Sequence, residues 1–316
     1  MFDLDFPRAF PGLQCEALFR ACPEDFIVNE DLGFPLAGTG QHVCVQIEKQ
    51  EQNTVWVARQ LAAFAGIKPM DVGYCGLKDR HAVTRQWFSI PTSRNGQLDI
   101  SGFSVEGVKV LAIGRHDRKL RRGMHRGNHF VIRLRDVHCG HDVLSRQFEM
   151  VCQKGVPNYF GEQRFGQAGG NLEDALALQG QHPSVWRERK HQFALSAIRS
   201  FLFNSVLAAR VRDGSWVNCV NGDPENTPTG PLWGRGRLSS AAELLAYESA
   251  ILSEFPEWLN VLEHVGVQQE RRALNVLPMN ASQEWDGNDW ILRFGLPPGS
   301  YATSVLRELV KTVSAV

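Results

Sequence analysis

The chain has 316 residues, enough to bury a sizeable core and more than one average domain requires, so one large domain or two are expected. Its 34 lysines and arginines balance 34 aspartates and glutamates, and this zero net charge excludes a global attraction to a polyanion. Any attraction to a charged partner must therefore come from a local patch.

The seven cysteines are scattered along the chain and none forms a C-x-x-C pair. An odd number at irregular spacing argues against a disulfide framework and against a zinc ribbon, so we predict reduced thiols. The N-terminus is acidic, and the longest purely apolar stretch, near residues 61–67, is too short to cross a bilayer. A cytoplasmic protein without a membrane segment is expected.

The first 150 residues predict mixed strands and helices. Short alternating runs at 26–28 and 43–47 are typical of half-buried strands. Apolar residues at helical spacing between Asn53, an N-cap residue, and Gly66, a terminator, predict a helix. Further strands are predicted at 72–75, 86–90, 105–113 and 130–134, and their density favours a largely antiparallel sheet with helices on one side.

From residue 155 the pattern changes to long helical segments, at 192–211 and 241–253, separated by a turn-rich stretch at 222–237. Near the end, 290–294 alternates like a strand, 296–300 breaks it, and 301–313 predicts a final helix. This order predicts an α+β protein. One domain, residues 1–154 with 290–316, would hold the mainly antiparallel sheet flanked by helices, and a mainly helical domain, 155–289, would be inserted into it.

A basic stretch spans residues 115–135, where eight arginines and lysines face one acid, Asp117, a net charge of +7 by counting (8 − 1). Cations at this density suit the neutralisation of phosphates in a nucleic acid. The alternative is a solvated charged loop before a strand whose Arg133 and Arg135 face water.

The His138-Cys139-Gly140-His141 run carries soft metal ligands, but no C-x-x-C or H-x3-H elsewhere completes a site. We therefore predict no metal there, and a loop in which Asp142 caps the next helix.

One carboxylate, Asp79, lies between Lys78 and Arg80 in the string G-L-K-D-R-H-A-V-T-R-Q at 76–86. Two flanking cations favour the ionised form, which is available as a nucleophile and not as a general acid. The alternative is a turn aspartate that caps its own loop.

Five strings of the chain resemble motifs of the TruD family of tRNA pseudouridine synthases, in the family's order and over nearly the whole length. They are the string at 76–86, D-F-I-V-N-E at 25–30, N-Y-F-G-E-Q-R-F-G at 158–166, S-A-I-R-S-F-L-F-N at 196–204 and L-P-P-G-S-Y-A-T-S at 296–304.

This resemblance implies an isomerase, an intramolecular transferase that detaches a uridine of tRNA at its N-glycosidic bond, rotates the base and rejoins it through C5. It implies Asp79 as the catalytic residue, uridine 13 as the target and no cofactor. The absence of a G-x-G-x-x-G or G-x4-G-K-[ST] string agrees with the last point. Whether Asp79 attacks C1′ of the sugar or C6 of the base stays open.

An extruded base needs an aromatic surface on which to stack. Asn128-His-Phe130 resembles the family's N-x-F element, which implies that Phe130 stacks on the uracil and Asn128 orders the active-site loop. The alternative for Phe130 is an inward strand residue beside Ile132 and Leu134.

Further residues are candidates for contact with the substrate or the RNA. Lys78 and Arg80 would hold a flanking phosphate or tune Asp79, and arginines of the basic stretch would follow the RNA backbone. Arg164 lies in a motif that contacts RNA directly or merely packs two domains together. The full set of candidates is Phe26, Glu30, Lys78, Arg80, Arg121, Arg122, Arg126, Asn128, Phe130 and Arg164.

Two other functions compete with an RNA-modifying enzyme. A non-catalytic tRNA-binding module would keep the basic residues, but binding phosphate does not require an acid at position 79. A glycosidase with Asp79 as nucleophile would need a second carboxylate, for which Glu30 is the candidate. The expected partner is tRNA, with no obligate protein partner, and a monomer is expected.

Overall fold

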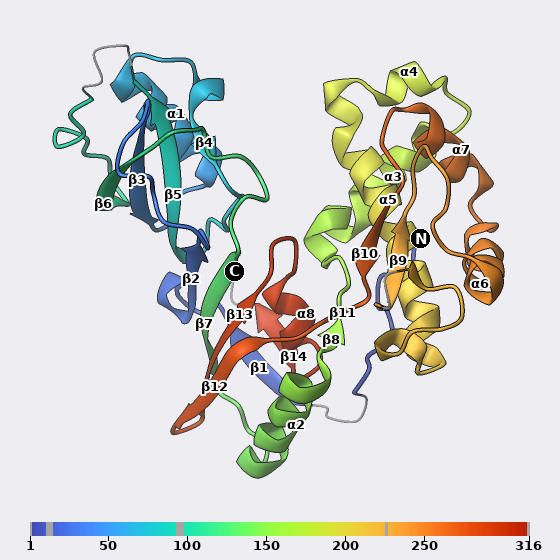
Figure 1. The fold of residues 1–316 in the computed structure, drawn as a ribbon. Helices are drawn as coiled ribbons and strands as arrows, with labels where there is room; N and C mark the ends of the chain where they lie inside the picture. Colours follow the sequence, from blue (N-terminus) through green and yellow to red (C-terminus); the bar gives the residue numbers. More distant parts are fainter. Residues whose placement is uncertain (1, 11–14, 93–97, 225–226, 315–316) are drawn as a thin grey trace. The chain divides into compact units, whose positions relative to one another are not determined.

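The computed structural model describes residues 2–10, 15–92, 98–224 and 227–314 (Figure 1). The chain divides into two compact units. The sheet unit comprises Gln14–Ser145, Pro278–Gly299 and Val310–Val316, and the helix-rich unit comprises Met1–Leu13, Arg146–Leu277 and Ser300–Leu309. The sequence therefore passes from one unit to the other several times.

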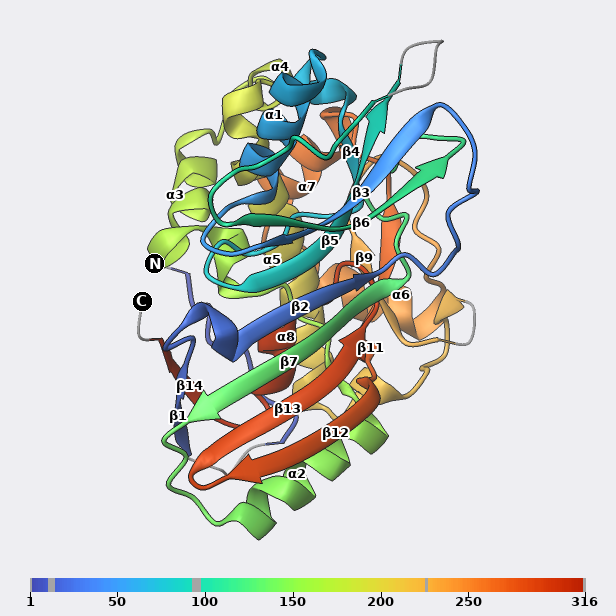
Figure 2. The same ribbon diagram turned by 90° about the vertical axis from the view of Figure 1, so that its left-hand side faces the viewer.

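The sheet unit is built on a ten-stranded sheet, as far as the described residues show. Its strands are β1 (Glu16–Phe19), β2 (Phe26–Asp31), β3 (His42–Lys49), β4 (Gly73–Tyr74), β5 (Val83–Pro91), β6 (Val108–His116), β7 (Gly127–Arg135), β12 (Met279–Asp286), β13 (Asp289–Leu296) and β14 (Lys311–Ser314). The order is β12-β13-β7-β2-β5-β3-β6, with β1, β4 and β14 off this path. Figure 2 shows β2, β7, β13 and β12 running side by side.

Most neighbouring strands are antiparallel, but β2 pairs with β5 and β1 with β14 in parallel. The expected α+β class and mostly antiparallel sheet are confirmed. Helix α1 (Thr54–Ala65) lies where the sequence predicted it. Asn53 caps it by accepting the N–H of Trp56, and Gly66 ends it in the left-handed conformation at φ 66°. Its buried face, with Val57 and Leu61, joins a core with the inward residues of β3 and β5.

The final predicted helix is wrong over most of its length. Helix α8 covers only Ala302–Leu306, and Lys311–Ser314 forms β14, which pairs with β1 from Glu16↔Lys311 to Phe19↔Ser314. Pairing with the neighbouring strand supplies hydrogen bonds that an exposed last helical turn would lack, so the tertiary partner outweighs the local helical pattern.

The helix-rich unit contains α3 (Gly170–Ala177), α4 (Pro183–Trp186), α5 (Gln192–Arg212), α6 (Ala242–Leu252) and α7 (Pro256–His264), with the short strands β8 (Val156–Pro157), β9 (Thr229–Leu232), β10 (Glu270–Ala273) and β11 (Asn275–Val276). Helix α2 (His141–Lys154) spans the boundary between the units. The prediction that Asp142 caps this helix is wrong, because the helix already begins at His141 and Asp142 lies in its first turn.

One segment, Arg189–Arg212, is long and apolar enough to cross a membrane, but 78% of its most apolar window is buried inside the protein. Its residues Ile198, Leu202 and Val206 lie in a hydrophobic core with Trp186 and Leu262. This burial is typical of the central helix of a globular unit.

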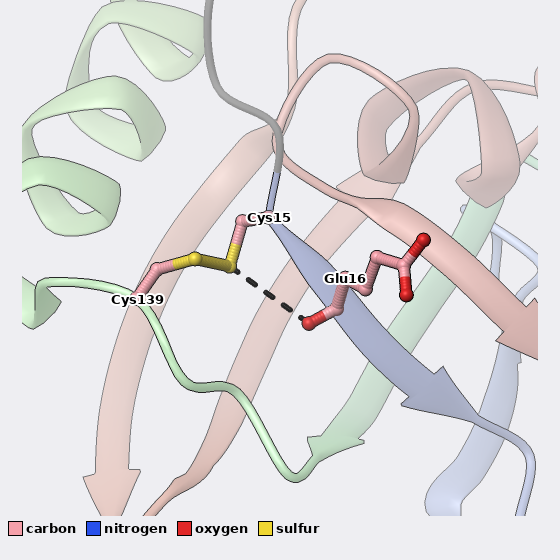
Figure 3. The surroundings of a disulfide bond; sticks show 3 residues. All are labelled: Cys15, Glu16 and Cys139. Atoms are coloured by element: carbon pink, nitrogen blue, oxygen red, sulfur yellow. Dashed lines mark hydrogen bonds between the residues drawn. A yellow bond between two sulfur atoms is a disulfide. The ribbon is translucent and has the colours of Figure 1, made fainter.

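The prediction that all cysteines are reduced thiols is corrected by a disulfide between Cys15 and Cys139 (Figure 3). Cys15 directly precedes β1, and Cys139 lies in the loop after β7. The antiparallel register that pairs Leu18 with Arg135 brings these two segments together, with 6.0 Å between the Cα atoms. Spacing along the sequence could not show this, because 124 positions separate the two cysteines.

Candidate active site

Asp79 lies in the loop of residues 76–82 between β4 and β5, which we call the catalytic loop because the sequence predicts the nucleophile there. Its carboxylate is held at both oxygens: Oδ2 lies 2.8 Å from Nη2 of Arg20, and Oδ1 accepts the backbone N–H of His81 at 3.1 Å. The side chain of Asp79 is 22% exposed. The loop-capping bond that the sequence offered as an alternative is thus present, together with an ion pair that the sequence did not predict.

Arg20 approaches the carboxylate from the end of β1. Its backbone has a φ of 63°, a conformation that is costly for a residue with a side chain and is concentrated at functional sites. The guanidinium lies over the rings of Phe19 and Phe26, with Cζ 4.7 and 4.5 Å from their centroids. Packing against these aromatic rings fixes the cation that faces Asp79.

Lys78 and Arg80 were expected to hold a flanking phosphate or to tune Asp79, and among the described residues neither forms an ion pair with the Asp79 carboxylate. Lys78 turns into the interior, where its Nζ lies 3.1 Å from Oε2 of Glu30 and the two side chains are 5% and 0% exposed. The other oxygen of Glu30 accepts the backbone N–H of Trp87 at 2.9 Å. Arg80 donates from Nε to the carbonyl of Glu51. Successive side chains of an extended loop point to different sides, so neighbours in sequence need not meet.

Lys49 holds the backbone of the catalytic loop. This fully buried lysine donates from Nζ to the carbonyl of Asp79 at 2.7 Å and to the carbonyl of Gln52 at 2.6 Å. Burial lowers the pKa of Lys49 to about 8, and the positive charge of Lys78 adds to this effect while Asp79 opposes it. A charged donor is thus bound to the peptide group of the predicted nucleophile.

A second set of bonds fixes the residues before Asp79. The backbone N–H of Lys78 donates to Oγ1 of Thr54, whose hydroxyl donates to Oε1 of Gln86. The amide nitrogen of Gln86 in turn donates to the carbonyl of Gly76. Because Thr54 and Gln86 are fully buried on α1 and β5, the loop is anchored to the core of the sheet unit.

An aromatic row runs across the sheet beside Arg20. Phe26 and Phe130 stack with centroids 6.0 Å apart and planes at 15°, and Phe294 follows at 5.7 Å from Phe130. Phe19 meets the other side of Phe26 edge to face. Arg20 thus connects this row to the Asp79 carboxylate. Phe130 is 7% exposed and shares the inward face of β7 with Ile132, the alternative that the sequence kept open.

Asn128 lies on β7, two residues before Phe130, with its side chain beside His125. Its Nδ2 lies 3.4 Å from Nε2 of His125, and its buried Oδ1 has no hydrogen-bond partner among the described residues. Burial, reinforced by the charge of Lys78, lowers the pKa of His125, which favours the neutral ring. A buried acceptor without a donor is costly, so a donor that reached Oδ1 would remove this cost.

Glu30, Cys75 and His125 offer ligand atoms within 4.8 Å of one another and could hold a metal ion. The arrangement does not favour a cation, because the ammonium of Lys78 already occupies Oε2 of Glu30. Burial raises the pKa of Cys75 to about 12, so its thiol stays protonated at neutral pH. This cluster serves the buried ion pair better than a metal.

The basic loop, which we define as residues 117–126 between β6 and β7, lies against the segment that leads into the catalytic loop. Gly123 donates its N–H to the carbonyl of Cys75, and Leu120 donates its N–H to Oγ of Ser89. Arg121 and Arg122 are exposed, and neither has an ion pair within the part of the chain that the structure describes. They are available to an anionic partner.

Other cations of the basic stretch are already paired. Arg126 donates from Nε and Nη2 to Oδ2 of Asp31, and this bond lowers the pKa of Asp31. Arg135 pairs with Asp25, and Arg133 with Asp286 and Asp289. Arg133 and Arg135 lie on the outer face of β7 with side chains 30% and 37% exposed, as the alternative expected, and these acids pair with them there.

Arg164 belongs to the helix-rich unit, in the short helix Glu162–Phe165. It donates from Nη1 to Oγ of Ser196 and from Nη2 to the hydroxyl of Tyr301, both at 2.9 Å. The structure thus gathers Asp79, Lys78, Glu30, Asn128, Phe26 and Phe130 in the sheet unit, and Arg164 lies in the other unit.

Sequence reasoning missed Arg20, Lys49 and His125. Lys49 left a signal, because it continues the inward alternation of Val43, Val45 and Ile47 and was therefore placed to be a buried lysine. Arg20 left none, since only the pairing of β1 with β7 brings it to Asp79. His125 was not singled out, because the basic stretch was interpreted only through its arginines and lysines.

Known proteins resemble this chain over nearly its whole length. The family model described as "tRNA pseudouridine synthase D (TruD)" matches residues 10–173 and 223–309. A tRNA pseudouridine synthase D of Cellvibrio japonicus is 52% identical, over 98% of this chain and 94% of the relative. A tRNA pseudouridine synthase D of Hydrogenovibrio crunogenus is 42% identical, over 96% of this chain and 95% of the relative.

The fold also has a solved counterpart. The crystal structure of the putative tRNA pseudouridine synthase D (TruD) from Methanosarcina mazei superposes with a TM-score of 0.65 over 96% of this chain and 95% of that one. The sequences are 20% identical, so this likeness concerns the fold alone.

Proposed function

The chain belongs to the TruD family of tRNA pseudouridine synthases, and we propose that it isomerises a uridine of tRNA to pseudouridine with Asp79 as the nucleophile. The observation that carries the proposal is the carboxylate of Asp79, held between Arg20 and the N–H of His81 while part of it stays open to solvent. An oriented, ionised carboxylate is suited to attack an electrophilic carbon.

The reaction balances within the nucleoside. The bond from C1′ to N1 breaks, the uracil rotates, and a bond from C1′ to C5 forms. C5 gives up a proton and N1 gains one, so no oxidant, reductant or cofactor is required. Asp79 is released at the end whether it first attacks C1′ of the sugar or C6 of the base.

The surrounding residues supply position and stacking. Phe130, of which 7% is exposed, is the ring on which the extruded base would stack, and Oδ1 of Asn128 is the acceptor that a uracil N–H would reach. Lys49 and Thr54 keep the catalytic loop in place. Arg121 and Arg122 attract the phosphates of the tRNA. Uridine 13 is the target that the family resemblance implies.

Specific contacts argue against the two alternative functions, a glycosidase and a module that only binds tRNA. As the acid/base of a glycosidase, Glu30 would need a proton to donate and access to the substrate, but it is bound by Lys78 and the N–H of Trp87 and is buried. A module that only binds tRNA has no use for a carboxylate that is oriented at both oxygens.

The domain roles follow from the position of these residues. We propose a catalytic domain within residues 1–154 and 290–316 and an inserted domain at 155–289. Asp79 and every residue assigned to its chemistry lie in the sheet unit. Division by compactness places 1–13, 146–154 and 300–309 with the helix-rich unit and 278–289 with the sheet unit, so the functional and packing boundaries differ at these four segments. A monomer acting in the cytoplasm is proposed.

An unmodified tRNA transcript is incubated with the purified protein alone, treated with a reagent that derivatises pseudouridine, and mapped by mass spectrometry to test the function. Pseudouridine at a single position, expected at residue 13, supports it. Free uracil would indicate a glycosidase, and bound but unchanged tRNA would indicate a binding module. Either of those results would overturn the proposal.

A further inference from the structure

Two arginines of the helix-rich unit share one aromatic ring. Arg272 projects from β10 and places its Cζ 4.2 Å from the centroid of Phe160, and the Cζ of Arg164 lies 5.4 Å from the same centroid. Arg272 also lies over Phe203, at 5.5 Å. The ring therefore holds two cations close enough to repel each other.

The hydrogen bonds of both arginines go to neutral groups. Arg164 donates to the hydroxyls of Ser196 and Tyr301. Arg272 donates from Nε and Nη2 to the carbonyl of Asn158, and from Nη2 to its Oδ1 at 2.6 Å. A guanidinium has five N–H donors, so these bonds orient the two groups without exhausting them.

Neither arginine forms an ion pair with a carboxylate among the residues that the structure describes. Other half-buried or buried arginines of the same unit do. Arg271, the neighbour on β10, lies 2.6 Å from Oε1 of Glu248, Arg210 lies 3.2 Å from Asp223, and Arg199 lies 3.3 Å from Glu270. The unit thus compensates its structural arginines and leaves Arg164 and Arg272 uncompensated.

This pair of charges is costly without an anion. Burial lowers the pKa of Arg272 to about 10, and the charge of Arg164 contributes in the same direction. A buried cation destabilises a protein unless an opposite charge accompanies it. A ligand that carries negative charge would supply the missing counter-charge for the two arginines.

We propose that Arg164 and Arg272 form a binding site for a phosphate group of the tRNA backbone. The planar forks of two guanidiniums match the geometry of phosphate oxygens, and their fixed orientation against Phe160 reduces the entropy lost on binding. The inference rests on the proposed function, since it takes tRNA as the source of the phosphate. It assigns a second point of attachment, on the helix-rich unit, besides the basic loop of the sheet unit.

The test compares the tRNA affinity of the full-length protein and two variants, Arg164→Met and Arg272→Met, over a range of salt concentrations. Each variant is expected to bind tRNA about 10-fold more weakly at physiological salt, the loss typical of one charge-assisted contact. The slope of log affinity against log salt is expected to become shallower by about one for each variant. Arg164→Met is the safeguard if the more deeply buried Arg272→Met fails to fold.

Arg237→Met is the matched control, because it removes the same charge from an exposed position of the same unit. Its salt slope is expected to equal that of the wild type. Wild-type slopes for Arg164→Met and for folded Arg272→Met would overturn the site, and so would an equal change in the control.

A second arm separates RNA phosphate from free phosphate. Inorganic phosphate is titrated into the wild type and the variants. Binding that both variants lose, with tRNA affinity unchanged, would assign the site to free phosphate and overturn the tRNA assignment. Pseudouridine formation by the wild type is measured in parallel. Its absence counts against the proposed function, whereas normal turnover with wild-type salt slopes in the variants counts against this site alone.

Discussion

The catalytic loop and the basic loop of the sheet unit are built in opposite ways. Around Asp79, the carboxylate, the backbone carbonyl and the preceding peptide group each have a partner, in Arg20, Lys49 and Thr54. In the basic loop, the backbone is tied down by Gly123 and Leu120, but the side chains of Arg121 and Arg122 extend into solvent.

The difference reflects two physical tasks. A nucleophile must stay within a fraction of an ångström of its productive position, so its neighbours are buried and hydrogen-bonded. Attraction of a polyanion acts over several ångströms and tolerates mobile side chains. Changes around the catalytic loop should therefore lower turnover, and changes in the basic loop should lower affinity.

Of the changes that leave Asp79 in place, Arg20→Met is expected to cause the largest loss. It removes the cation 2.8 Å from the carboxylate and should lower kcat by about 10²- to 10³-fold, with little change in tRNA affinity. Single-turnover rates at saturating protein measure this. Arg20→Lys should recover part of the rate if charge matters more than packing on Phe26, and equal losses in both variants would contradict that reason.

Lys49→Met is expected to have the next largest effect, because the longer-range order of the catalytic loop depends on this buried donor. A loss of about 10- to 10²-fold in kcat, with KM nearly unchanged, is the outcome of a displaced nucleophile. In the wild type, kcat should fall as the pH rises through about 8, where Lys49 loses its proton. In Lys49→Met, kcat should not fall in this pH range. If the variant keeps the fall, another group causes it.

The stability of the fold should change with pH in the direction opposite to kcat. In the unfolded chain a lysine keeps its proton to about pH 10.4, whereas Lys49 in the fold releases it near pH 8. Between these values the unfolded state binds more protons, so the contribution of Lys49 to the free energy of unfolding increases with pH. Denaturant titrations of the wild type and Lys49→Met, compared at pH 7 and 9.5, measure the difference. A difference independent of pH would contradict the lowered pKa.

The smallest effect on turnover is expected for the double change Arg121→Ala and Arg122→Ala. Affinity for tRNA should fall, and the salt slope should become shallower by between about one and two, while kcat at saturation stays near that of the wild type. Arg293→Ala is a suitable control, since Arg293 also belongs to the sheet unit and has a side chain 43% exposed, but it is paired with Glu284. A fall in kcat at saturating tRNA in the double variant, but not in Arg293→Ala, would contradict the assignment of the basic loop to binding alone.

Local signals predicted much of the fold. The cap at Asn53 and the left-handed Gly66 fixed α1 to the residue, and period-two alternation found β2, β3, β5, β7 and β13. The signals failed where a distant partner decided the structure. Residues 311–314 became a strand because β1 lies beside them, and Cys15 met Cys139 because β1 pairs with β7.

The candidate site shows the same limit. The string around Asp79 predicted the nucleophile, yet the cation beside it comes from position 20 and not from positions 78 or 80. Charge adjacency along the chain says little about where side chains point. Lys49 could have been found from the sequence, because the alternation of β3 places it inward. A lysine is rarely buried unless its charge has a partner, so this position is a signal.

Asp79→Asn, assayed with tRNA fully bound by excess protein, examines the chemistry without interference from binding. Asparagine preserves the shape of the side chain but cannot act as the nucleophile, so no pseudouridine should form while tRNA affinity stays within about a few fold of the wild type. Pseudouridine formed by that variant at the wild-type rate would show that another group performs the reaction.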